Sequence, residues 1–355
     1  MMQRKIPCTY MRSGTSSGPF LDLRDLPTDS DERNAILFRI MGSPDPRQVD
    51  GLGGATPVTS KVVMVQPSQR VGVDVDYLFA QVAIDKPIVD MRPTCGNMMT
   101  GVGPFAIEQG WVDIVAGQTT VRVYSLNTGS YIEIEVDTPD RKVNYVDGTT
   151  AIDGVPGTGA PIWLNQFDLS GGTTGHLFPT GNRKDKIDGV EVSIVDASNL
   201  IMMMHAESFG LDGTEDRPFF QSHPSLMKRF EEIRVEAGVL AGIGDVTNSV
   251  LPRIGVLSPP RNDGSIKSQY FTPHVLHPSH AVSGAICIAT ACKANGTVAA
   301  DVVEIDSANP DNIVIEHASG RMPVQVSVSD QDPFTVTSAR VVRTARKIMD
   351  GFVYY

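Results

Sequence analysis

Two similar helix starts, one towards each end of the chain, constrain the fold more than any other feature of the sequence. In the first, Cys95-Gly96-Asn97 precedes an apolar pattern at 98–109. In the second, Ser283-Gly284 opens a similar pattern at 283–294, and glycine and a strand-rich region follow each pattern. The repeat predicts a duplicated domain whose two helix N-termini could face one cleft and hold two carboxylates. Chance similarity between two ordinary buried helices is the alternative.

The rest of the pattern consists mainly of short strands. The 33 glycines and 24 prolines, with many valines and threonines, are typical of strands joined by turns. We expect strands at 6–10, 61–65, 74–84, 120–125, 131–136, 190–195, 200–204, 254–257, 268–271, 312–316, 323–328 and 339–344. Helices are also expected at 29–41 and 224–241. The second of these has a core-facing apolar stripe formed by Leu226, Phe230, Ile233, Ala237 and Leu240.

The length and the middle of the chain suggest where the domains divide. A chain of 355 residues can form two domains with substantial cores. The stretch at 148–182 is rich in glycine, threonine and proline, and its end predicts a hinge. We therefore expect an α+β chain with halves at 1–182 and 183–338. The last segment, 339–355, could cross back to complete the first half.

The net charge and the spacing of the cysteines limit which binding partners and which cellular location can be expected for this protein. The net charge is −11 and no stretch is rich in lysine or arginine, so a nucleic-acid partner is not expected. The cysteines Cys8, Cys95, Cys287 and Cys292 have no framework spacing, which fits free thiols in a reducing cytoplasm. No apolar run is long enough for a membrane span and no signal peptide is apparent. We expect a cytoplasmic protein without a membrane partner, and a homodimer is left open.

Cys95 is the first candidate for chemistry. It lies between a segment with a strand pattern and a following segment with a helix pattern. Free N–H groups and the positive dipole end of a first helix turn favour an anionic ligand and lower a thiol's pKa. Gly96 lets another molecule approach the backbone closely. The alternative is a buried structural cysteine.

Lys61 is the second candidate. It follows the glycine loop Asp50-Gly51-Leu52-Gly53-Gly54 and opens an apolar strand. Partial desolvation in such a place lowers the pKa of an amine and makes it a usable base. Paired with Cys95 across a carbon atom, it could move a proton between two positions. The alternative is an edge lysine that faces water.

Two further segments could contact an anion. The loop from Arg12 to Gly18 carries hydroxyls and amides that could cradle a carboxylate or a phosphate, although a plain polar turn is equally compatible. His274, His277 and His280 recur near the second helix start without acidic or cysteine ligands between them, so we expect His274 to touch an anionic ligand rather than a metal. Arg343 and Arg346 are expected to be surface charges. Because metal-ligand clusters and dinucleotide fingerprints are missing from the sequence, no cofactor is expected.

At these motifs the chain resembles the PrpF family, which shares the diaminopimelate epimerase fold. The resemblance runs nearly end to end and rests on several ordered motifs. They include Met11-Arg12-Ser13-Gly14-Thr15-Ser16, Asp50-Gly51-Leu52-Gly53-Gly54, Pro57-Val58-Thr59-Ser60-Lys61-Val62, Cys95-Gly96-Asn97, Ile152-Asp153-Gly154-Val155-Pro156-Gly157-Thr158 and Arg343-Thr344-Ala345-Arg346-Lys347. Within the family the chain is most similar to the 4-oxalomesaconate tautomerases and isomerases.

The resemblance implies a fold and a set of site residues. The fold would have two pseudo-symmetric β-barrel-like halves, each around a central helix, with the active site between them. Lys61 and Cys95 would be the base and acid of a cofactor-free proton transfer, and Ser283 replaces the second thiol of the epimerases. The expected substrate-binding residues are Arg12, Ser13, Gly14, Thr15, Ser16, Gly53, Gly54, Ser60, Gly96, Asn97, His274, Ser283, Gly284 and Ala285. Ser13 and Ser17 depart from the family loop, which usually has glycine and a basic residue there.

The function implied is isomerisation of a small unsaturated tricarboxylate. The first expectation is 4-oxalomesaconate, in the breakdown of gallate and protocatechuate, by a keto–enol or 1,3-allylic shift. Isomerisation of 2-methylaconitate, aconitate or methylitaconate is the alternative. A non-catalytic anion-binding protein of the same fold is the rival from another class.

Overall fold

The computed structural model describes residues 3–91, 94–167, 169–247, 249–272, 274–329 and 334–355, and they form two compact units. The first unit runs up to Asn165 and includes Val342–Tyr355; the second unit is Gln166–Val341. The chain therefore changes unit earlier than the expected hinge at 182. Part of the glycine-rich stretch joins the second unit because the buried Asp196 carboxylate accepts the N–H groups of Thr173 and Thr174 at 2.8 and 2.7 Å.

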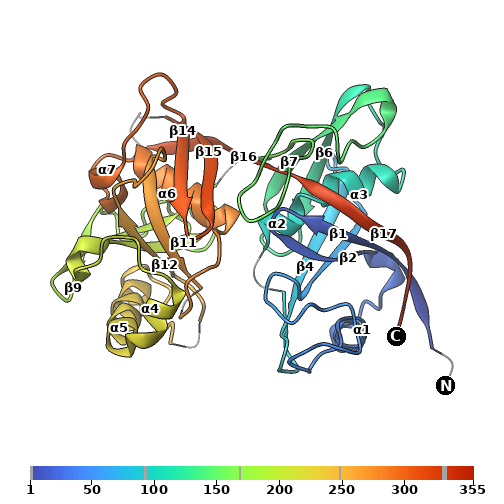
Figure 1. Cartoon of the computed structure of the whole chain (residues 1–355), viewed down its shortest axis with the longest axis horizontal. Coiled ribbons are helices and arrows are strands. Elements are labelled where there is room, and N and C mark those ends of the chain that lie inside the picture. Colours follow the sequence, from blue (N-terminus) through green and yellow to red (C-terminus); the bar gives the residue numbers. More distant parts are fainter. Residues whose placement is uncertain (1–2, 92–93, 168, 248, 273, 330–333) are drawn as a thin grey trace. The chain divides into compact units, whose positions relative to one another are not determined.

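The first unit is built mainly from strands, with one long helix and two short ones. Its strands are β1 (Lys5–Ser13), β2 (Ser16–Asp22), β3 (Lys61–Pro67), β4 (Val75–Val82), β5 (Val89–Asp90), β6 (Gly117–Ser125), β7 (Tyr131–Thr138), β8 (Ile162–Gln166), whose last residue already belongs to the second unit, and β17 (Ala345–Tyr354). Its helices are α1 (Ser30–Met41), α2 (Gly96–Met99) and α3 (Val102–Glu108), with 3₁₀ turns at Leu23–Asp25 and Pro139–Arg141. Figure 1 shows β17, in red, running beside β1, in blue, and the two strands pair antiparallel from Lys5↔Tyr354 to Ser13↔Ala345.

The second unit has a similar mixture of strands and helices. Its strands are β9 (Asp185–Ile187), β10 (Val190–Asp196), β11 (Leu200–His205), β12 (Arg253–Ser258), β13 (Ile266–Phe271), β14 (Asn312–His317), β15 (Gly320–Ser329) and β16 (Thr335–Arg343), whose last two residues belong to the first unit. Its helices are α4 (Arg217–Ser222), α5 (Pro224–Leu240), α6 (Val282–Lys293) and α7 (Val298–Val302), with a 3₁₀ turn at Ala206–Phe209.

The two units repeat one order of strand pairing. In the first unit, β1–β2 is antiparallel, β2–β3 parallel, β3–β4 antiparallel, β4–β6 parallel and β6–β7 antiparallel. The second unit shows the same alternation of antiparallel and parallel pairs, in the order β10–β11, β11–β12, β12–β13, β13–β14 and β14–β15. The helices also occupy equivalent positions in the two units. In the first unit α2 and α3 come directly before β6, and in the second unit α6 and α7 come directly before β14, the strand equivalent to β6. The duplication expected from the two helix starts is therefore present in the pairing order.

Each unit buries a helix that the sequence singled out. In the first unit, α1 packs on one face of β1–β4 through a cluster that includes Leu37, Val62 and Met64. On the other face Phe20 meets Phe105 of α3, with ring centroids 5.8 Å apart. Because β3 is covered on both faces, it reads as a continuous apolar run.

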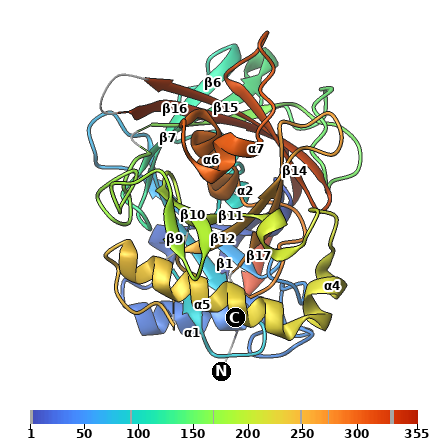
Figure 2. The same cartoon turned by 90° about the vertical axis from the view of Figure 1, so that its left-hand side faces the viewer.

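The second unit has the same layering. Phe230, Ile233 and Ala237 of α5 join a core cluster with residues of β9 to β13, and Figure 2 shows α5 beside β9 and β12. The expected stripe ends early, because Leu240 is exposed at the last turn. On the other side α6 is buried almost all round, as its apolar sequence requires.

The first central helix differs from the continuous helix expected at 98–109. It is broken into α2 and α3 at Thr100–Gly101. The Gly101 N–H donates to Ser13 Oγ at 2.7 Å and is also 3.2 Å from the Met98 carbonyl. A hydroxyl from the neighbouring hairpin thus enters the helix ladder and explains the break. Within the described residues, no helix has the length and apolar character needed to span a membrane.

Candidate active site

Cys95 lies at the start of α2, as the sequence predicts. It is the N-cap residue, with an extended backbone, and its free thiol side chain is half-buried. Its carbonyl accepts the Met99 N–H at 2.8 Å and the Tyr77 hydroxyl at 3.4 Å. Tyr77 is fully buried, and desolvation, followed by the neighbouring Cys95, holds its phenol pKa well above the ordinary value. The other three cysteines are buried, so Cys95 carries the most exposed of the four thiols.

Lys61 is not an edge residue. It opens β3 between β2 and β4 and is only 8% exposed. Its Nζ donates to Gln81 Oε1 at 2.8 Å and lies 4.9 Å from the centre of the Phe79 ring. The Gln81 amide is itself fixed, because Nε2 donates to the carbonyls of Ser60 and Pro57. Gln81 and Phe79 were not singled out from the sequence, since only the β3–β4 register brings them to the lysine.

The segment Arg12 to Gly18 is a tight hairpin rather than an open loop. β1 ends at Ser13 and β2 begins at Ser16, so only Gly14 and Thr15 form the turn. Gly14 has φ +54°, and a Cβ there would lie 2.2 Å from Asn97 Oδ1. The same Oδ1 accepts the Thr15 N–H at 3.3 Å. The turn therefore contacts the Cys95-Gly96-Asn97 helix start directly.

Several predicted binding residues have their polar groups engaged within the first unit. Ser13 is fully buried, and its hydroxyl donates to the Asn97 carbonyl at 2.6 Å. Ser60 is also buried; its hydroxyl accepts from Gln48 Nε2 and donates to the Val82 carbonyl. The backbone N–H groups of Gly53 and Gly54 donate to the carbonyls of Met41 and Thr59, and the Gly96 carbonyl accepts the Thr100 hydroxyl. Ser16 is buried in the hairpin.

Thr15 differs from these residues. Its Oγ1 is buried and has no hydrogen-bond partner among the residues that the structure describes. A buried hydroxyl without a partner is costly unless a ligand or a water satisfies it. Of the hairpin residues, Thr15 therefore has the free donor best suited to a ligand oxygen.

Two arginines lie at or next to the contact between the hairpin and Thr344, since Arg12 is part of the hairpin and Arg343 precedes Thr344 in the chain. Arg12 donates to Thr344 Oγ1 at 2.9 Å and to the Thr344 and Gly14 carbonyls, and desolvation together with Arg346 lowers its pKa. Arg343 was expected at the surface, and this is wrong: it is 3% exposed. Burial lowers its pKa to about 10, and its Nε and one Nη have no partner within the described part of the chain.

In the second unit Ser283 lies in the first turn of α6 and is half-buried. Its Oγ accepts from Asn199 Nδ2 at 3.2 Å, and Asn199 also donates to the Tyr270 hydroxyl at 3.2 Å. Gly284 packs on Tyr270, where a Cβ would lie 2.7 Å from the ring, and Ala285 is fully buried. His274 is exposed, with its Nδ1 3.7 Å from a carboxylate oxygen of Glu231. An acidic neighbour makes His274 a poor contact for an anion.

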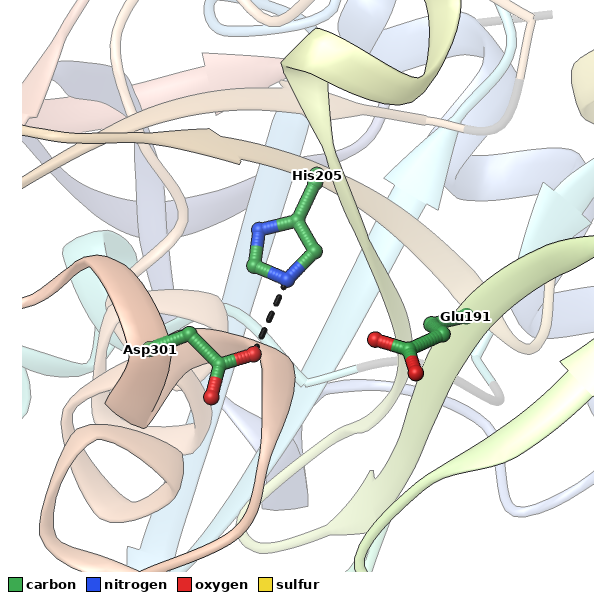
Figure 3. A group of neighbouring side chains, drawn as sticks. All are labelled: Glu191, His205 and Asp301. Atoms are coloured by element: carbon green, nitrogen blue, oxygen red, sulfur yellow. Dashed lines mark hydrogen bonds and ion pairs between the residues drawn. The ribbon is translucent and has the colours of Figure 1, made fainter.

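A set of potential metal ligands also occurs in the second unit. Glu191, His205 and Asp301 bring one ligand atom each within 4.8 Å of the others (Figure 3). His205 Nε2 lies 3.0 Å from Asp301 Oδ2. Lys184 forms ion pairs with both carboxylates, and these bonds raise the pKa of its amine. The group is thus a lysine-centred ion-pair cluster, and a metal ion would have to displace the ammonium.

Comparison with known proteins identifies the family. The family model described as "PrpF protein" matches residues 3–355. The (4E)-oxalomesaconate Delta-isomerase of a Novosphingobium species is 43% identical over 98% of this chain and 97% of its own length. The 4-oxalomesaconate tautomerase of Pseudomonas putida is 40% identical over 99% and 97%. The 3-methylitaconate isomerase of Eubacterium barkeri is 37% identical over 99% and 97%.

Solved structures agree with this assignment. The crystal structure of a methylitaconate-delta-isomerase superposes with a TM-score of 0.87 at 37% identity, over 99% of this chain and 96% of the other. A hydroxyproline epimerase from Agrobacterium vitis, at 11% identity and a TM-score of 0.57 over 99% and 94%, shares the epimerase-type fold. The chain is an isomerase, and it belongs to the PrpF family.

Proposed function

We propose that this isomerase acts on 4-oxalomesaconate, without a cofactor, by proton transfer between Lys61 and Cys95. Two relatives of at least 40% identity over nearly their whole length carry (4E)-oxalomesaconate or 4-oxalomesaconate in their names, which supports this substrate. The observation that carries the proposal is Lys61 itself. It is a buried lysine whose amine is held by a neutral amide, in the same unit as a half-buried free thiol at a helix start.

The lysine would act as a base in its neutral form. A neutral amine can donate one N–H to Gln81 Oε1 and still direct its lone pair at an acidic C–H of the substrate. Proton removal forms the ammonium and leaves the electron pair delocalised through the carbonyl or alkene as an enolate or dienolate.

The thiol would complete the shift. Cys95 gives its proton to the far carbon, which becomes a C–H, or to the oxygen in a keto–enol change, and is left as a thiolate. One proton leaves the substrate and one returns, so the product is an isomer and no oxidant or reductant is needed. The ammonium of Lys61 and the thiolate of Cys95 then exchange a proton through solvent, and the roles swap for the reverse direction.

The developing negative charge and the carboxylates need donors. In the first unit, the Thr15 hydroxyl, the exposed part of the Arg12 guanidinium and the first turn of α2 are proposed to supply them. In the second unit, Ser283 and the first turn of α6 are proposed to do so. Two pseudo-symmetric, barrel-like halves are part of this proposal, and the repeated pairing order supports such halves.

Location, pathway and assembly belong to the same proposal. A cytoplasmic location, a role in gallate or protocatechuate breakdown and a homodimeric assembly stay predictions. The substrate class, a small unsaturated tricarboxylate, is chosen because an acidic protein with localised cationic and helix-end donors selects small anions rather than polyanions.

A second candidate is a 1,3-allylic shift on methylitaconate, 2-methylaconitate or aconitate. It is favoured by the 3-methylitaconate isomerase at 37% identity, by the 2-methyl-aconitate isomerase at 33% identity and by the solved methylitaconate isomerase. Both candidates require the same base and acid, and they differ in the substrate carbon that is reprotonated.

A substrate panel in deuterated water distinguishes them. Purified enzyme is incubated with 4-oxalomesaconate, 2-methylaconitate, aconitate and methylitaconate, and proton NMR follows isomer formation and deuterium uptake. The proposal predicts the highest kcat/KM for 4-oxalomesaconate. Turnover confined to the methyl-substituted acids would transfer the assignment to the second candidate.

Two variants test the machinery. Cys95→Ala should lower turnover by roughly 10²-fold or more, as expected when a positioned acid is lost. Lys61→Met should abolish exchange of the substrate's acidic hydrogen, while an analogue still binds. If instead analogue binding collapses and exchange continues at saturating substrate, Lys61 is only an electrostatic anchor.

A further inference from the structure

The turn between β10 and β11 contains Asn199, a residue to which the proposed mechanism assigns no role. β10 and β11 pair as far as Asp196↔Leu200, which leaves Ala197, Ser198 and Asn199 as the turn. Asn199 is half-buried, and its Nδ2 lies 3.2 Å from both Ser283 Oγ and the Tyr270 hydroxyl oxygen. Its two N–H hydrogens are enough to serve both acceptors.

This contact fixes what the Ser283 hydroxyl can do. A serine hydroxyl has one hydrogen and two acceptor lone pairs. Because Asn199 donates to the oxygen, the hydroxyl hydrogen is free to donate to another oxygen. Ser283 is half-buried at the first turn of a twelve-residue helix, where backbone N–H groups also favour an anion. The free hydrogen therefore suits a ligand carboxylate.

Tyr270 holds Asn199 in place. It is 2% exposed, and burial raises its phenol pKa to about 12, so it stays a neutral hydroxyl. Its ring packs against Gly284, the residue after Ser283, where a Cβ would come within 2.7 Å. Tyrosine, asparagine and serine thus form one connected group around the start of α6.

The first unit has the same relation between turn and helix start. There the turn residue Thr15 donates its N–H to Asn97 Oδ1, two residues after Cys95. In both units, then, the turn between the first two strands of the repeated pairing order contacts the helix start. The recurrence argues that the Asn199 contact belongs to a site and is not incidental.

We propose that Asn199 is a positioning residue that orients the Ser283 hydroxyl as a hydrogen-bond donor to a carboxylate of the tricarboxylate substrate. The inference rests on the proposed function, since it assigns Ser283 to substrate binding. A carboxylate held in this way is bound equally in the ground state and in the transition state. Loss of Asn199 should therefore raise KM more than it lowers kcat.

A double-mutant cycle tests the coupling. Asn199→Ala and Ser283→Ala are each expected to raise KM about tenfold, the effect of one lost hydrogen bond to a charged group. If Asn199 acts through Ser283, the double variant should also show about tenfold, not about a hundredfold. Ser198→Ala, in the same turn with its hydroxyl on Gln166 Oε1, is the matched control and should leave KM unchanged.

Thermal stability separates a positioning role of Asn199 from a purely structural one. Asn199→Ala leaves the buried Tyr270 hydroxyl without its partner, so this variant is expected to lose some thermal stability. Ser283→Ala should keep the wild-type thermal midpoint and still raise KM; a KM effect of Ser283→Ala that appears only with a loss of stability would mean that the group is structural, and would overturn the proposal. Tyr270→Phe should reproduce part of the KM effect. Multiplicative KM effects in the cycle, or wild-type kinetics in Asn199→Ala, would also overturn it.

The same cycle is measured on binding of trans-aconitate by calorimetry, which needs no turnover. If the wild type is active on the panel and Asn199→Ala matches it, only the Asn199 assignment falls. If the wild type turns over none of the panel but its binding of trans-aconitate shows the non-additive cycle, the proposed reaction falls and the binding role stands. Absence of both turnover and binding would remove both.

Discussion

At the scale of single residues, the four cysteines differ in what surrounds their sulfur atoms. Cys8, Cys287 and Cys292 lie in apolar cores, whereas Cys95 caps a helix and is half-buried. Burial raises the pKa of Cys8 to about 12 and raises those of Cys287 and Cys292 further. A thiol whose pKa is raised stays protonated at pH 8 and is a poor nucleophile.

Native protein treated with iodoacetamide at pH 8 should therefore be alkylated once, at Cys95. Peptide mass spectrometry locates the adduct, and Cys95→Ser is expected to remain unlabelled over the same time. In guanidinium chloride all four cysteines should react, which controls for the reagent. Comparable native labelling of Cys8 would contradict the burial that sets these cysteines apart.

Ser13 is a second residue whose role follows from its contacts. The family resemblance made it a departure from the usual glycine, with substrate identity in question. The structure uses its hydroxyl to bridge α2 and α3, between the Asn97 carbonyl and the Gly101 N–H. Ser13→Ala would leave the Asn97 carbonyl with the Thr100 N–H at 3.3 Å and the Gly101 N–H with the Met98 carbonyl at 3.2 Å. The variant loses the shorter hydrogen bonds that Ser13 makes in this buried place, at a cost of about 1 kcal/mol.

Urea unfolding should show this loss for Ser13→Ala, with a reduced midpoint and an unchanged m value. Ser17→Ala is the control from the same hairpin, because its hydroxyl makes only a 3.4 Å contact with Tyr10 and should change stability by less than about 0.5 kcal/mol. Equal stability of the two variants would show that the bridge contributes little.

At the scale of elements, the strands with alternating or continuous apolar residues were predictable. β3, β4, β6, β7 and β10 to β15 fall close to their expected ranges because burial of one or both faces imposes the pattern, whereas β9 was not expected. β17 was missed beyond 344, because Ala345–Tyr354 is mostly exposed and carries charges. β2 was missed because Ser16, Ser17, Gly18 and Pro19 resemble a turn, although the chain pairs there with β1.

The candidate site was predictable only in part, for a related reason. Local sequence around Cys95 and Lys61 carries their own signals, namely a helix start and a glycine loop before an apolar strand. Gln81, Tyr77 and Asn199 carry none, since each reaches its partner through strand register or a turn. The burial of Arg343 was likewise not visible in a charged C-terminal motif.

Asn127 shows how one side chain can replace strand pairing. Its Oδ1 accepts the Phe79 N–H at 2.8 Å, and its Nδ2 donates to the carbonyls of Phe79 and Met91. Phe79 is the residue whose ring lies under the Lys61 amine. Asn127→Ala would leave the Phe79 backbone unpaired in β4, two residues before Gln81, which holds the amine of the candidate base Lys61.

We expect Asn127→Ala to lose about 1–3 kcal/mol of unfolding free energy and to speed amide exchange in β4. Thr128→Ala, next to it with an exposed hydroxyl contact to Ser130, should do neither. Hydrogen exchange followed by mass spectrometry resolves β4 from the rest of the chain. Unchanged exchange of β4 in the asparagine variant would mean that strand pairing alone holds this edge.

At the scale of the whole molecule, the sequence ends of the first unit come together. β17 pairs with β1 over its whole length, and the backbone of Tyr355 exchanges two hydrogen bonds with Arg4 at 3.1 and 2.9 Å. The second unit is inserted between β8 and β17 of the first. The first unit, which carries Lys61 and Cys95, therefore depends on β17 near the end of the chain, whereas the second unit does not.

A chain that stops at Thr344 should lose the first unit and keep the second. Without β17, the nine-residue β1 becomes a sheet edge and Ile6, Cys8 and their neighbours lose cover on that side. Hydrogen exchange should rise throughout β1–β4 while β10–β13 stay protected, and isomerase activity should vanish.

The matched control is a circular permutant that begins at Ala345 and joins Tyr355 to the start of the chain through a short glycine-serine linker. It supplies β17 ahead of β1 and should restore both protection and activity, because the joined ends already lie side by side. Loss of protection in β10–β13 of the truncated chain would show that the two units fold as one, and full activity of the truncated chain would show that β17 is dispensable.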